Sequence, residues 1–240
     1  MLDLQILVIS LLRSTARRAR VTHELSSIGR SWQFLDAIDG SEFCPPKSEY
    51  DPVKVIRLLG FELTGSEIGC FLSHKKAWRM CLERNCPTLI FEDDFVINGN
   101  FEDAIDIALN KFTSWDILRL QGLAESAHTE VASFGRSKIV VNQSDPVGAT
   151  AYIVTPSSAS TLLQKSTQIF EPLDHFLEHK KFHGLQVLAL IPYPVDVTGD
   201  KSTIADRPAR RNVRGYTKIK RSIFRVLDRL SSSNPWFPNS

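Results

Sequence analysis

The sequence lacks the features that several familiar protein classes require. No apolar run reaches 18 residues, so we expect no membrane-spanning helix. The motifs G-x-G-x-x-G, G-x-x-x-x-G-K-[ST] and G-x-S-x-G are absent, which removes the common signatures of dinucleotide-binding proteins, P-loop NTPases and α/β-hydrolases. The function must therefore be sought in other residues.

Cysteine is also scarce, and its spacing fits no disulfide framework. The cysteines are Cys44, Cys70, Cys81 and Cys86. Reduced thiols in a cytosol fit this usage. Cys70 and His74 share a helix face, but no second pair completes a zinc site. The start, "MLDLQILVISLLRSTARRAR", is apolar before it is basic, the reverse of a signal peptide, so "LQILVIS" is predicted to be a buried strand and the protein cytoplasmic.

The 240 residues are 42% hydrophobic and 23% charged, which suits one large globular domain or two small ones. Apolar runs such as residues 4–10, 88–91 and 185–192 alternate with segments that carry helix signals. Thr64 and Glu67 form a capping box at the start of one such helix. This alternation predicts an α/β fold with a mostly parallel sheet flanked by helices.

Three acids, Glu92, Asp93 and Asp94, follow directly after a predicted buried strand in "TLIFEDDFVINGNF". If the strand geometry continues, Glu92 and Asp94 point to the same side. Two oxygen ligands at this spacing suit a hard cation such as Mg²⁺ or Mn²⁺, and ligands of open α/β sheets bind beyond the carboxyl ends of the strands. The alternative is a solvated turn in which the acids cap the following segment.

Several segments together resemble glycosyltransferase family 25. These are "LVISLLRSTARRARVTHEL", "FLDAIDG", "LTGSEIGCFLSHKKAW", "LIFEDDFVI", "WDILRL", "GATAYIVTPSSASTLL", "EPLDHFL" and "PYPVDVTGDKSTI", in the family's order. The resemblance covers residues 4 to about 204. It implies a GT-A-like (Rossmann-like) fold, a UDP-sugar donor, Mn²⁺ or Mg²⁺ as cofactor, and inversion at the anomeric carbon. The family includes bacterial enzymes that add galactose to lipooligosaccharide and domains that galactosylate collagen hydroxylysine.

The resemblance also implies roles for individual residues. Glu92, Asp94 and Asp196 are expected to bind the metal, although Asp196 stands near a position where the family usually carries glutamine, so His175 and Asp200 remain alternatives for the third ligand. Asp174 is expected to be the base that deprotonates the acceptor hydroxyl. Its alternative role is a helix-start acid favoured by the helix dipole. The expected donor-binding residues are Ser10, Leu11, Arg13, Ala37, Asp39, Ser73, His74 and Asp93.

The function that follows from the resemblance is an inverting galactosyltransferase that acts on a lipooligosaccharide or lipopolysaccharide core. A glucosyltransferase that uses UDP-glucose is the alternative within the same class, because no motif distinguishes the epimeric hydroxyl. A non-catalytic protein that binds sugar nucleotides or glycans is the alternative from another class. Intact acids at 92–94 and Asp174 favour the enzyme. Acceptor sugar, linkage and oligomeric state stay open.

The end of the chain differs in charge from the rest. Residues 207–229 contain nine Lys or Arg and one acid, a net +8, and because the whole chain carries +2, the remainder carries −6. We expect a glycosyltransferase domain over residues 1–206 and a basic amphipathic helical tail over 207–240. The tail is expected to bind the anionic cytoplasmic face of the bacterial inner membrane. A helix packed on the domain is the alternative, and the acidic body argues against nucleic acid as partner.

Overall fold

The computed structural model describes residues 3–41, 45–123, 127–144, 146 and 148–199 of the chain. The basic tail predicted over residues 207–240 lies outside this part, as does Asp200. Within the described residues, no helix is both long and apolar enough to cross a membrane.

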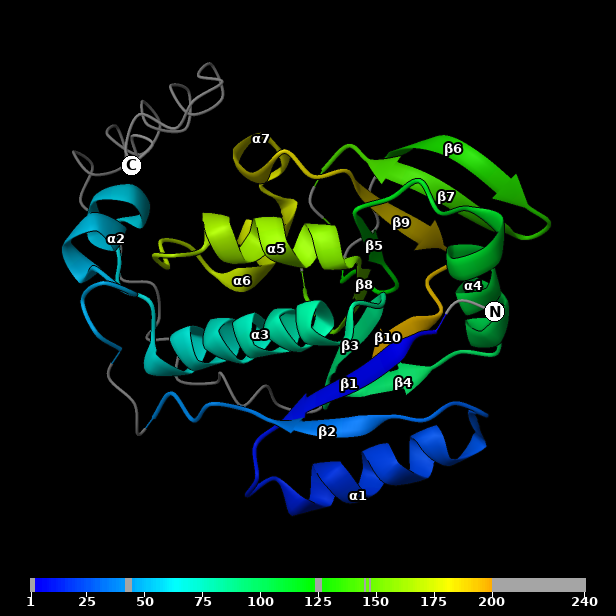
Figure 1. Ribbon diagram of the computed structural model, residues 1–240, viewed down its shortest axis with the longest axis horizontal. Coiled ribbons are helices and arrows are strands. Elements are labelled where there is room, and N and C mark those ends of the chain that lie inside the picture. Colours follow the sequence, from blue (N-terminus) through cyan, green and yellow to red (C-terminus); the bar gives the residue numbers. More distant parts are fainter. Residues whose placement is uncertain (1–2, 42–44, 124–126, 145, 147, 200–240) are drawn as a thin grey trace.

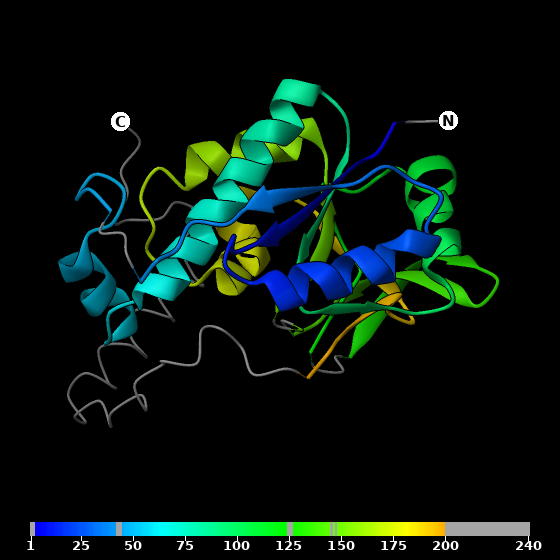
Figure 2. The same ribbon diagram turned by 90° about the horizontal axis from the view of Figure 1, so that it is seen from below.

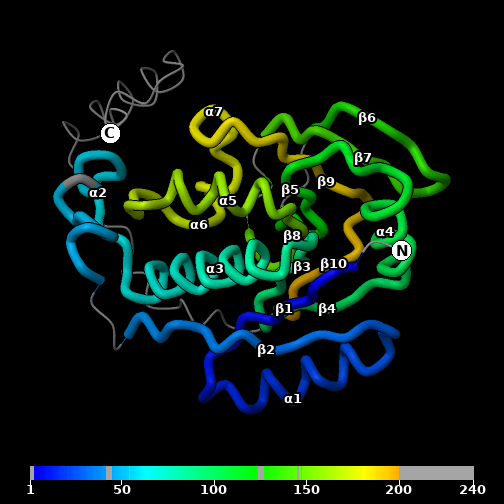
Figure 3. Tube along the Cα trace, viewed as in Figure 1, coloured from blue at the N-terminus to red at the C-terminus, as the bar shows by residue number. Residues whose placement is uncertain are grey.

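An eight-stranded sheet forms the centre of the molecule (Figure 1). From one edge to the other, its strands are β2 (Gln33–Asp36), β1 (Gln5–Ser10), β3 (Thr88–Glu92), β8 (Ala151–Val154), β5 (Ile117–Arg119), β9 (Val187–Ile191), β7 (Ser137–Asn142) and β6 (His128–Phe134). β8 and β7 run opposite to the other strands. Figure 3 follows the chain from β1 and β2 at one edge to β6 and β7 at the other. The predicted α/β fold with a mostly parallel sheet is confirmed.

A second, two-stranded antiparallel sheet joins β4 (Phe95–Ile97) to β10 (Val195–Val197). Two irregular turns, η1 (Leu25–Ser27) and the π-helical η2 (Ile107–Lys111), extend two of the helices. The helices are α1 (Thr15–Glu24), α2 (Pro52–Leu59), α3 (Gly65–Arg84), α4 (Phe101–Asp106), α5 (Pro156–Lys165), α6 (Leu173–Glu178) and α7 (Lys180–His183).

The two faces of the large sheet carry separate apolar clusters. Along β1, Leu7 and Ile9 belong to the cluster formed with α3, α5 and α6, whereas Ile6 and Val8 belong to the cluster formed with α1 and α4. Successive side chains of a strand point to opposite faces, so covering both faces makes the strand a continuous apolar run. Figure 1 shows α3 and α5 side by side, and Figure 2 shows α1 on the other side of β1 and β2 from α3.

The helix α3 begins where the capping box predicted it. The Thr64 hydroxyl accepts a hydrogen bond from the Glu67 backbone N–H at 3.2 Å, and the Glu67 carboxylate accepts one from the Thr64 N–H at 2.9 Å. Asn85 ends the helix in the left-handed conformation, with φ of 52°. The helix therefore holds a fixed register along the sheet, which matters because it supplies one wall of the site.

One predicted helix is shorter than its pattern indicated. Serine is a common helix-capping residue, so Ser14 in the sequence predicts a helix through about Ile28, but α1 ends at Glu24 and continues only as the turn η1. The hydroxyls of Ser26 and Ser27 donate to the carbonyl oxygens of His23 and Glu24. Such local bonds compete with the helical backbone pattern, which explains the early end of the helix.

Candidate active site

The carboxyl ends of β1, β2 and β3 surround a pocket that opens to solvent and contains about 700 Å³ of empty space, adjoining open solvent included. α3 forms the wall that faces these strand ends. The residues that line the pocket are Ile9, Ser10, Leu11, Arg13, Arg17, Ala37, Ile38, Asp39, Gly40, Ser66, Cys70, Ser73, His74, Glu92, Asp93 and Asp94. All eight predicted donor-binding residues are among them, together with two of the three predicted metal ligands.

Asp93 is held in place by two partners, one at the end of β1 and one on α1. Its carboxylate accepts a hydrogen bond from the Ser10 hydroxyl at 2.6 Å and forms an ion pair with the Arg17 guanidinium at 2.7 Å. Both members of the ion pair are largely buried, with side chains 17% and 11% exposed. Arg17 therefore neutralises one of the three acids, and the resemblance had not singled it out as a site residue.

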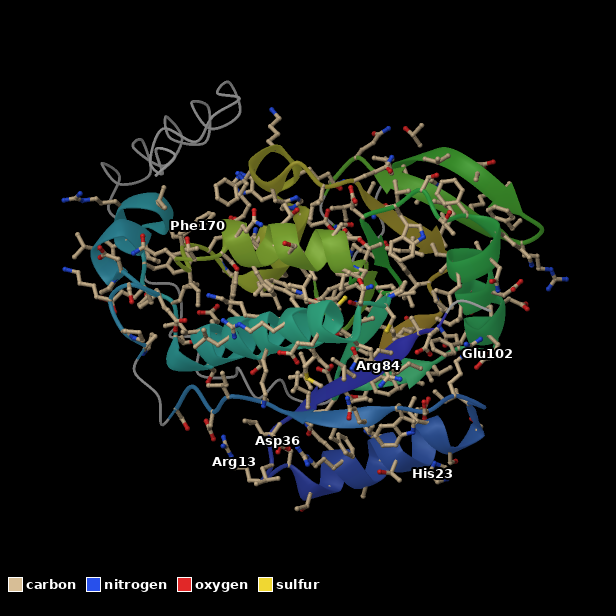
Figure 4. The ribbon with its side chains drawn as sticks, viewed as in Figure 1. Arg13, His23, Asp36, Arg84, Glu102 and Phe170 are labelled. Atoms are coloured by element: carbon tan, nitrogen blue, oxygen red, sulfur yellow. The ribbon has the colours of Figure 1, made fainter. Side chains whose placement is uncertain are left out.

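Further arginines of α1 fix the backbone around the acids. Arg20 donates to the carbonyl oxygens of Asp93 and Phe95, the latter at 2.6 Å. Arg18 donates to the Ser10 carbonyl at 2.9 Å and pairs with Asp36 at the end of β2. Figure 4 shows Arg13 and Asp36 near the same end of α1, with His23 at the other end. The run of basic residues after Ser14 is thus turned toward the strand ends.

Glu92 lies between two residues of α3. Its Oε1 accepts a hydrogen bond from the Cys70 thiol at 3.4 Å, and the same oxygen is 3.4 Å from His74 Nε2. Burial raises the pKa of Glu92, but the nearby imidazole of His74, with smaller effects of Cys70 and Arg17, outweighs burial and lowers that pKa below its ordinary value. Burial, and then the charge of Glu92, raise the pKa of the Cys70 thiol.

Asp94 has the opposite environment. Burial, and then the nearby charge of Glu92, raise the pKa of Asp94 to about 6. Its Oδ1 is buried and has no hydrogen-bond partner within the described residues. A buried carboxylate oxygen without a partner is costly, so this atom is a candidate ligand for a cation.

Close packing of glycines brings the loop after β2 against α3. A Cβ atom on Gly40 would lie 1.7 Å from the carbonyl oxygen of Gly65, and one on Gly69 would lie 2.6 Å from that of Ile38. Ser73 secures the same contact, because its hydroxyl accepts from the Ile38 N–H at 2.8 Å and donates to the Gly69 carbonyl at 2.6 Å. The Ser73 hydroxyl therefore donates its proton to the backbone of α3, and Ser73 positions the loop after β2 against this helix.

Asp39, at the mouth of the pocket, forms an ion pair with Arg13, whose side chain is 61% exposed. Asp39 also accepts hydrogen bonds from the backbone N–H and hydroxyl of Ser41, at 3.1 and 2.6 Å. Arg13 is thus an accessible cation directly beside the predicted donor site. A guanidinium in this position can contact a phosphate or a ribose hydroxyl.

The remaining predicted site residues lie outside the pocket lining. Asp174 is half-buried in the first turn of α6, where its carboxylate accepts from the His175 N–H at 3.0 Å, and its charge contributes to the raised pKa of Cys70. Asp196 is exposed on β10, opposite Val96, and accepts a hydrogen bond from the Asn98 amide at 3.0 Å. The structure does not bring Asp196 to the pocket, because the β4–β10 pairing directs it to the Asn98 turn.

The sequence reasoning overlooked two contributions to this pocket. Arg17 could have been found, because an unusually basic first helix after β1 needs acidic partners near the strand ends. Cys70 was set aside because no second cysteine–histidine pair exists, and its neighbour Glu92 comes from a distant strand. The fold brings Glu92 next to Cys70 and His74. Their spacing in the sequence does not indicate this contact.

The fold and the pocket define a GT-A-like α/β protein with an acidic site at the carboxyl ends of its parallel strands. The model of glycosyltransferase family 25 (LPS biosynthesis protein) matches residues 3–177, and the chain belongs to this family.

Three relatives show how wide this family is. The chain is 30% identical over 185 residues to the mouse "Inactive glycosyltransferase 25 family member 3", covering 72% of this chain and 31% of the mouse protein. It is 28% identical to the Haemophilus influenzae "Lipooligosaccharide biosynthesis protein lic2B", covering 65% and 60%. It is 23% identical to the zebrafish "Procollagen galactosyltransferase 1", covering 84% and 38%. The chain thus spans about a third of the length of the mouse relative.

Proposed function

We propose that this chain transfers galactose from UDP-galactose to a core sugar of lipooligosaccharide or lipopolysaccharide, with inversion at the anomeric carbon. Membership of family 25 and similarity to a lipooligosaccharide biosynthesis protein support this substrate class. The observation that carries the proposal is the pocket itself. It gathers Arg13, Asp93, Asp94 and Glu92 at the carboxyl ends of β1 and β3, where open α/β sheets bind nucleotides.

The pocket residues fit Mn²⁺ or Mg²⁺ as cofactor. Glu92 and Asp94 both line the pocket, and the buried Asp94 Oδ1 has no partner among the described residues. These are oxygen donors of the kind that hard divalent cations prefer. A bound cation would stabilise the charge that develops on the diphosphate as the bond to the sugar breaks. The position of Asp196 on β10 does not support it as a third ligand.

The chain's own residues account for donor binding and orientation. Asp93, neutralised by Arg17 and fixed by Ser10, presents a rigid backbone between the two proposed cation ligands. The loop of Ile38 to Gly40 is held against α3 and offers its backbone groups to the nucleoside. Arg13 can approach the diphosphate by exchanging its pairing with Asp39, because its own side chain is 61% exposed.

An inverting transfer needs one base to remove the proton of the acceptor hydroxyl. We assign this role to Asp174, which is half-buried at the start of α6 and close enough to affect the Cys70 thiol. An acceptor lying between α6 and the donor pocket would bring its hydroxyl to this carboxylate.

The proposed membrane attachment concerns the basic tail. A lipid-linked acceptor would make binding to the cytoplasmic face of the inner membrane useful, because it confines enzyme and substrate to one surface. The support is the charge of the segment, +8 over residues 207–229. Co-sedimentation with anionic vesicles at increasing salt measures this binding for residues 1–240 and for residues 1–206. The longer form should bind in a salt-sensitive way, and equal binding of both forms would contradict the proposal.

The proposed function is tested with a panel of UDP-sugars and Mn²⁺. UDP release should be fastest with UDP-galactose and should rise when a lipooligosaccharide core is added. A preference for UDP-glucose would show that the protein is a glucosyltransferase, the alternative within the same class. Tight binding of a UDP-sugar without turnover on any acceptor would favour a non-catalytic binding protein. The mouse and human relatives are named inactive glycosyltransferases.

A further inference from the structure

Three potential metal ligands of different chemistry meet on the floor of the pocket. Cys70 Sγ, His74 Nε2 and a Glu92 carboxylate oxygen all lie within 4.8 Å of one another. We propose that they form a site for a borderline-soft divalent cation such as Zn²⁺, which shares Glu92 with the oxygen-ligand site of Asp94. The occupant would be held by one sulfur, one nitrogen and one oxygen, with a fourth position open to the pocket.

Two of the three distances between these ligand atoms match those of a tetrahedral zinc site, and the third, between Cys70 and His74, is at most 4.8 Å. Ordinary Zn–N and Zn–O bond lengths place nitrogen and oxygen ligands about 3.4 Å apart, and sulfur and oxygen ligands about 3.6 Å apart. The observed separations from Glu92 Oε1 are 3.4 Å to His74 Nε2 and 3.4 Å to Cys70 Sγ. Three protein ligands with an open fourth position are the usual arrangement of accessible zinc sites.

His74 supplies the second, independent observation. Its side chain is fully buried, yet its Nε2 has no hydrogen-bond partner within the described residues. Its other nitrogen, Nδ1, is 2.6 Å from the Tyr152 hydroxyl, which also accepts a hydrogen bond from Trp78 at 3.0 Å. The ring therefore cannot turn to satisfy Nε2 elsewhere.

Neither neutral tautomer of His74 is satisfied without a cation. If Nε2 carries the proton, a buried donor faces Glu92 without hydrogen-bond geometry. If Nδ1 carries it and donates to Tyr152, the Nε2 lone pair faces a carboxylate oxygen at 3.4 Å. A cation between Nε2 and Oε1 removes the conflict, and the Nδ1 contact is the partner that zinc-binding histidines usually have.

The ligand types select the metal. A thiolate and an imidazole favour Zn²⁺ over Mg²⁺ or Mn²⁺, which prefer oxygen ligands. Ionised Cys70 and Glu92 with a neutral His74 carry −2, which balances the cation. Because Glu92 is also a ligand of the proposed Mn²⁺ or Mg²⁺ site, zinc would withdraw it from that site. Zinc would then inhibit sugar transfer. This inhibition rests on the proposed function, whereas the binding of zinc rests only on the geometry of the three ligands.

Cobalt serves as a spectroscopic probe for the site, because Co²⁺ takes the same ligands and reports a thiolate ligand by a charge-transfer band. Metal-stripped full-length protein titrated with Co²⁺ under reducing conditions should show this band with one equivalent, and Zn²⁺ should abolish it. Folded protein that gives no such band would overturn the proposal.

Two matched cysteine variants assign the band. Cys70→Ser should remove it and weaken Zn²⁺ binding, measured by calorimetry, by more than about 10²-fold, since even changes behind the ligands cost 10–100-fold. Cys81→Ala, three turns along the same helix and outside the pocket lining, should keep both. Equal zinc affinity in Cys70→Ser would contradict the site. If Cys70→Ser does not fold, Glu92→Gln should shift the cobalt spectrum of an otherwise intact protein, and an unchanged spectrum would contradict it.

The inhibition is measured separately, as UDP release in the presence of Mn²⁺ and increasing Zn²⁺. Each variant is compared with its own rate without zinc. Wild type and Cys81→Ala should lose activity at the zinc concentration that bleaches the cobalt band, and Cys70→Ser should need at least tenfold more. Inhibition at the same concentration in all three would refute the shared role of Glu92. A protein with the cobalt band but no transferase activity would refute the proposed function alone.

Discussion

The pocket acids and the Arg119–Glu178 pair both place carboxylates inside the protein, but the protein satisfies them differently. Arg119 and Glu178 form an ion pair at 2.8 Å with side chains 2% and 1% exposed, and Arg119 also donates to the carbonyl oxygens of Gln121 and Gly148. In the pocket, Asp94 Oδ1 and His74 Nε2 have no hydrogen-bond partner among the described residues.

The contrast separates a structural role from a ligand-binding role. A buried charge costs several kcal/mol unless it is paired, so a region selected only for stability pairs its charges, as Arg119 and Glu178 do. The pocket keeps unpaired polar atoms together with an opening to solvent. These atoms are satisfied when a ligand arrives, which is the pattern of functional sites that reduce stability.

The largest expected effect is on turnover in Asp94→Asn. The substitution removes a charged cation ligand with little change in volume, so UDP-galactose turnover with Mn²⁺ should fall below detection. Because burial disfavours the charge of Asp94, the thermal unfolding midpoint at pH 7 should stay equal or rise. Activity close to wild type would remove Asp94 from the cation site, and a large drop in the midpoint would make its role structural.

The second effect concerns the base. Asp174→Asn should lower acceptor-dependent turnover by about 10²–10⁴, the usual contribution of general acid–base catalysis. UDP affinity, measured by calorimetry, should hardly change, since Asp174 lies outside the donor pocket lining. Asp3→Asn, the same substitution at an exposed carboxylate outside the pocket lining, is the control and should keep most of the activity. A collapse of UDP affinity with normal turnover per bound donor would make Asp174 a donor ligand instead.

The third prediction tests the structural role of the Arg119–Glu178 ion pair. Arg119→Met leaves Glu178 buried without its main partner and should destabilise the protein by about 3–5 kcal/mol. The double variant Arg119→Met/Glu178→Met should recover most of the loss, because two apolar side chains need no partners. Urea unfolding of the three proteins gives these values. A double variant as unstable as the single one would mean that the surrounding carbonyl groups, and not the ion pair, carry the effect.

The smallest effect is a pH dependence of stability from His183. Its Nε2–H donates to the Leu177 carbonyl and its Nδ1 accepts from the Leu185 N–H, so the buried ring is satisfied in its neutral form. Burial lowers the pKa of His183 to about 4, below the value of about 6.5 in the unfolded chain. The unfolded state therefore binds more protons between these values, and stability falls as the pH falls through this window.

At pH 5 the contribution of His183 should be about 2 kcal/mol less stabilising than at pH 7. Urea unfolding of wild type and His183→Gln at both values measures the difference. The variant should be less stable at pH 7 but should lose that part of the pH dependence. Identical pH dependence in both proteins would show that His183 is not buried in its neutral form.

Local signals predicted much of this fold from the sequence. Thr64 and Glu67 predicted the start of α3, and the apolar runs around Leu7 and Ile90 predicted the central strands. These features depend on neighbouring residues, so a single sequence contains them. The reversed direction of β8 and the β4–β10 pairing depend on long connections, which local patterns do not determine.

Part of the candidate site could also be predicted from the sequence. The strand-end rule and the family resemblance brought the predicted donor residues to one pocket, since they follow strands whose ends meet. Asp196 shows the limit, because its direction depends on the pairing of β10 with β4. The contacts of Glu92 with Cys70 and His74 depend on where α3 crosses β3, which only the assembled fold determines.

The central claim is that the acids of the pocket bind the diphosphate of a sugar nucleotide through a divalent cation. Calorimetric titration of the wild-type protein with UDP, once with Mn²⁺ and once with excess chelator, tests it most directly. We predict saturable binding with Mn²⁺ that falls by at least about 10²-fold in chelator and in Asp94→Asn. Equal UDP affinity in all three conditions would contradict the account.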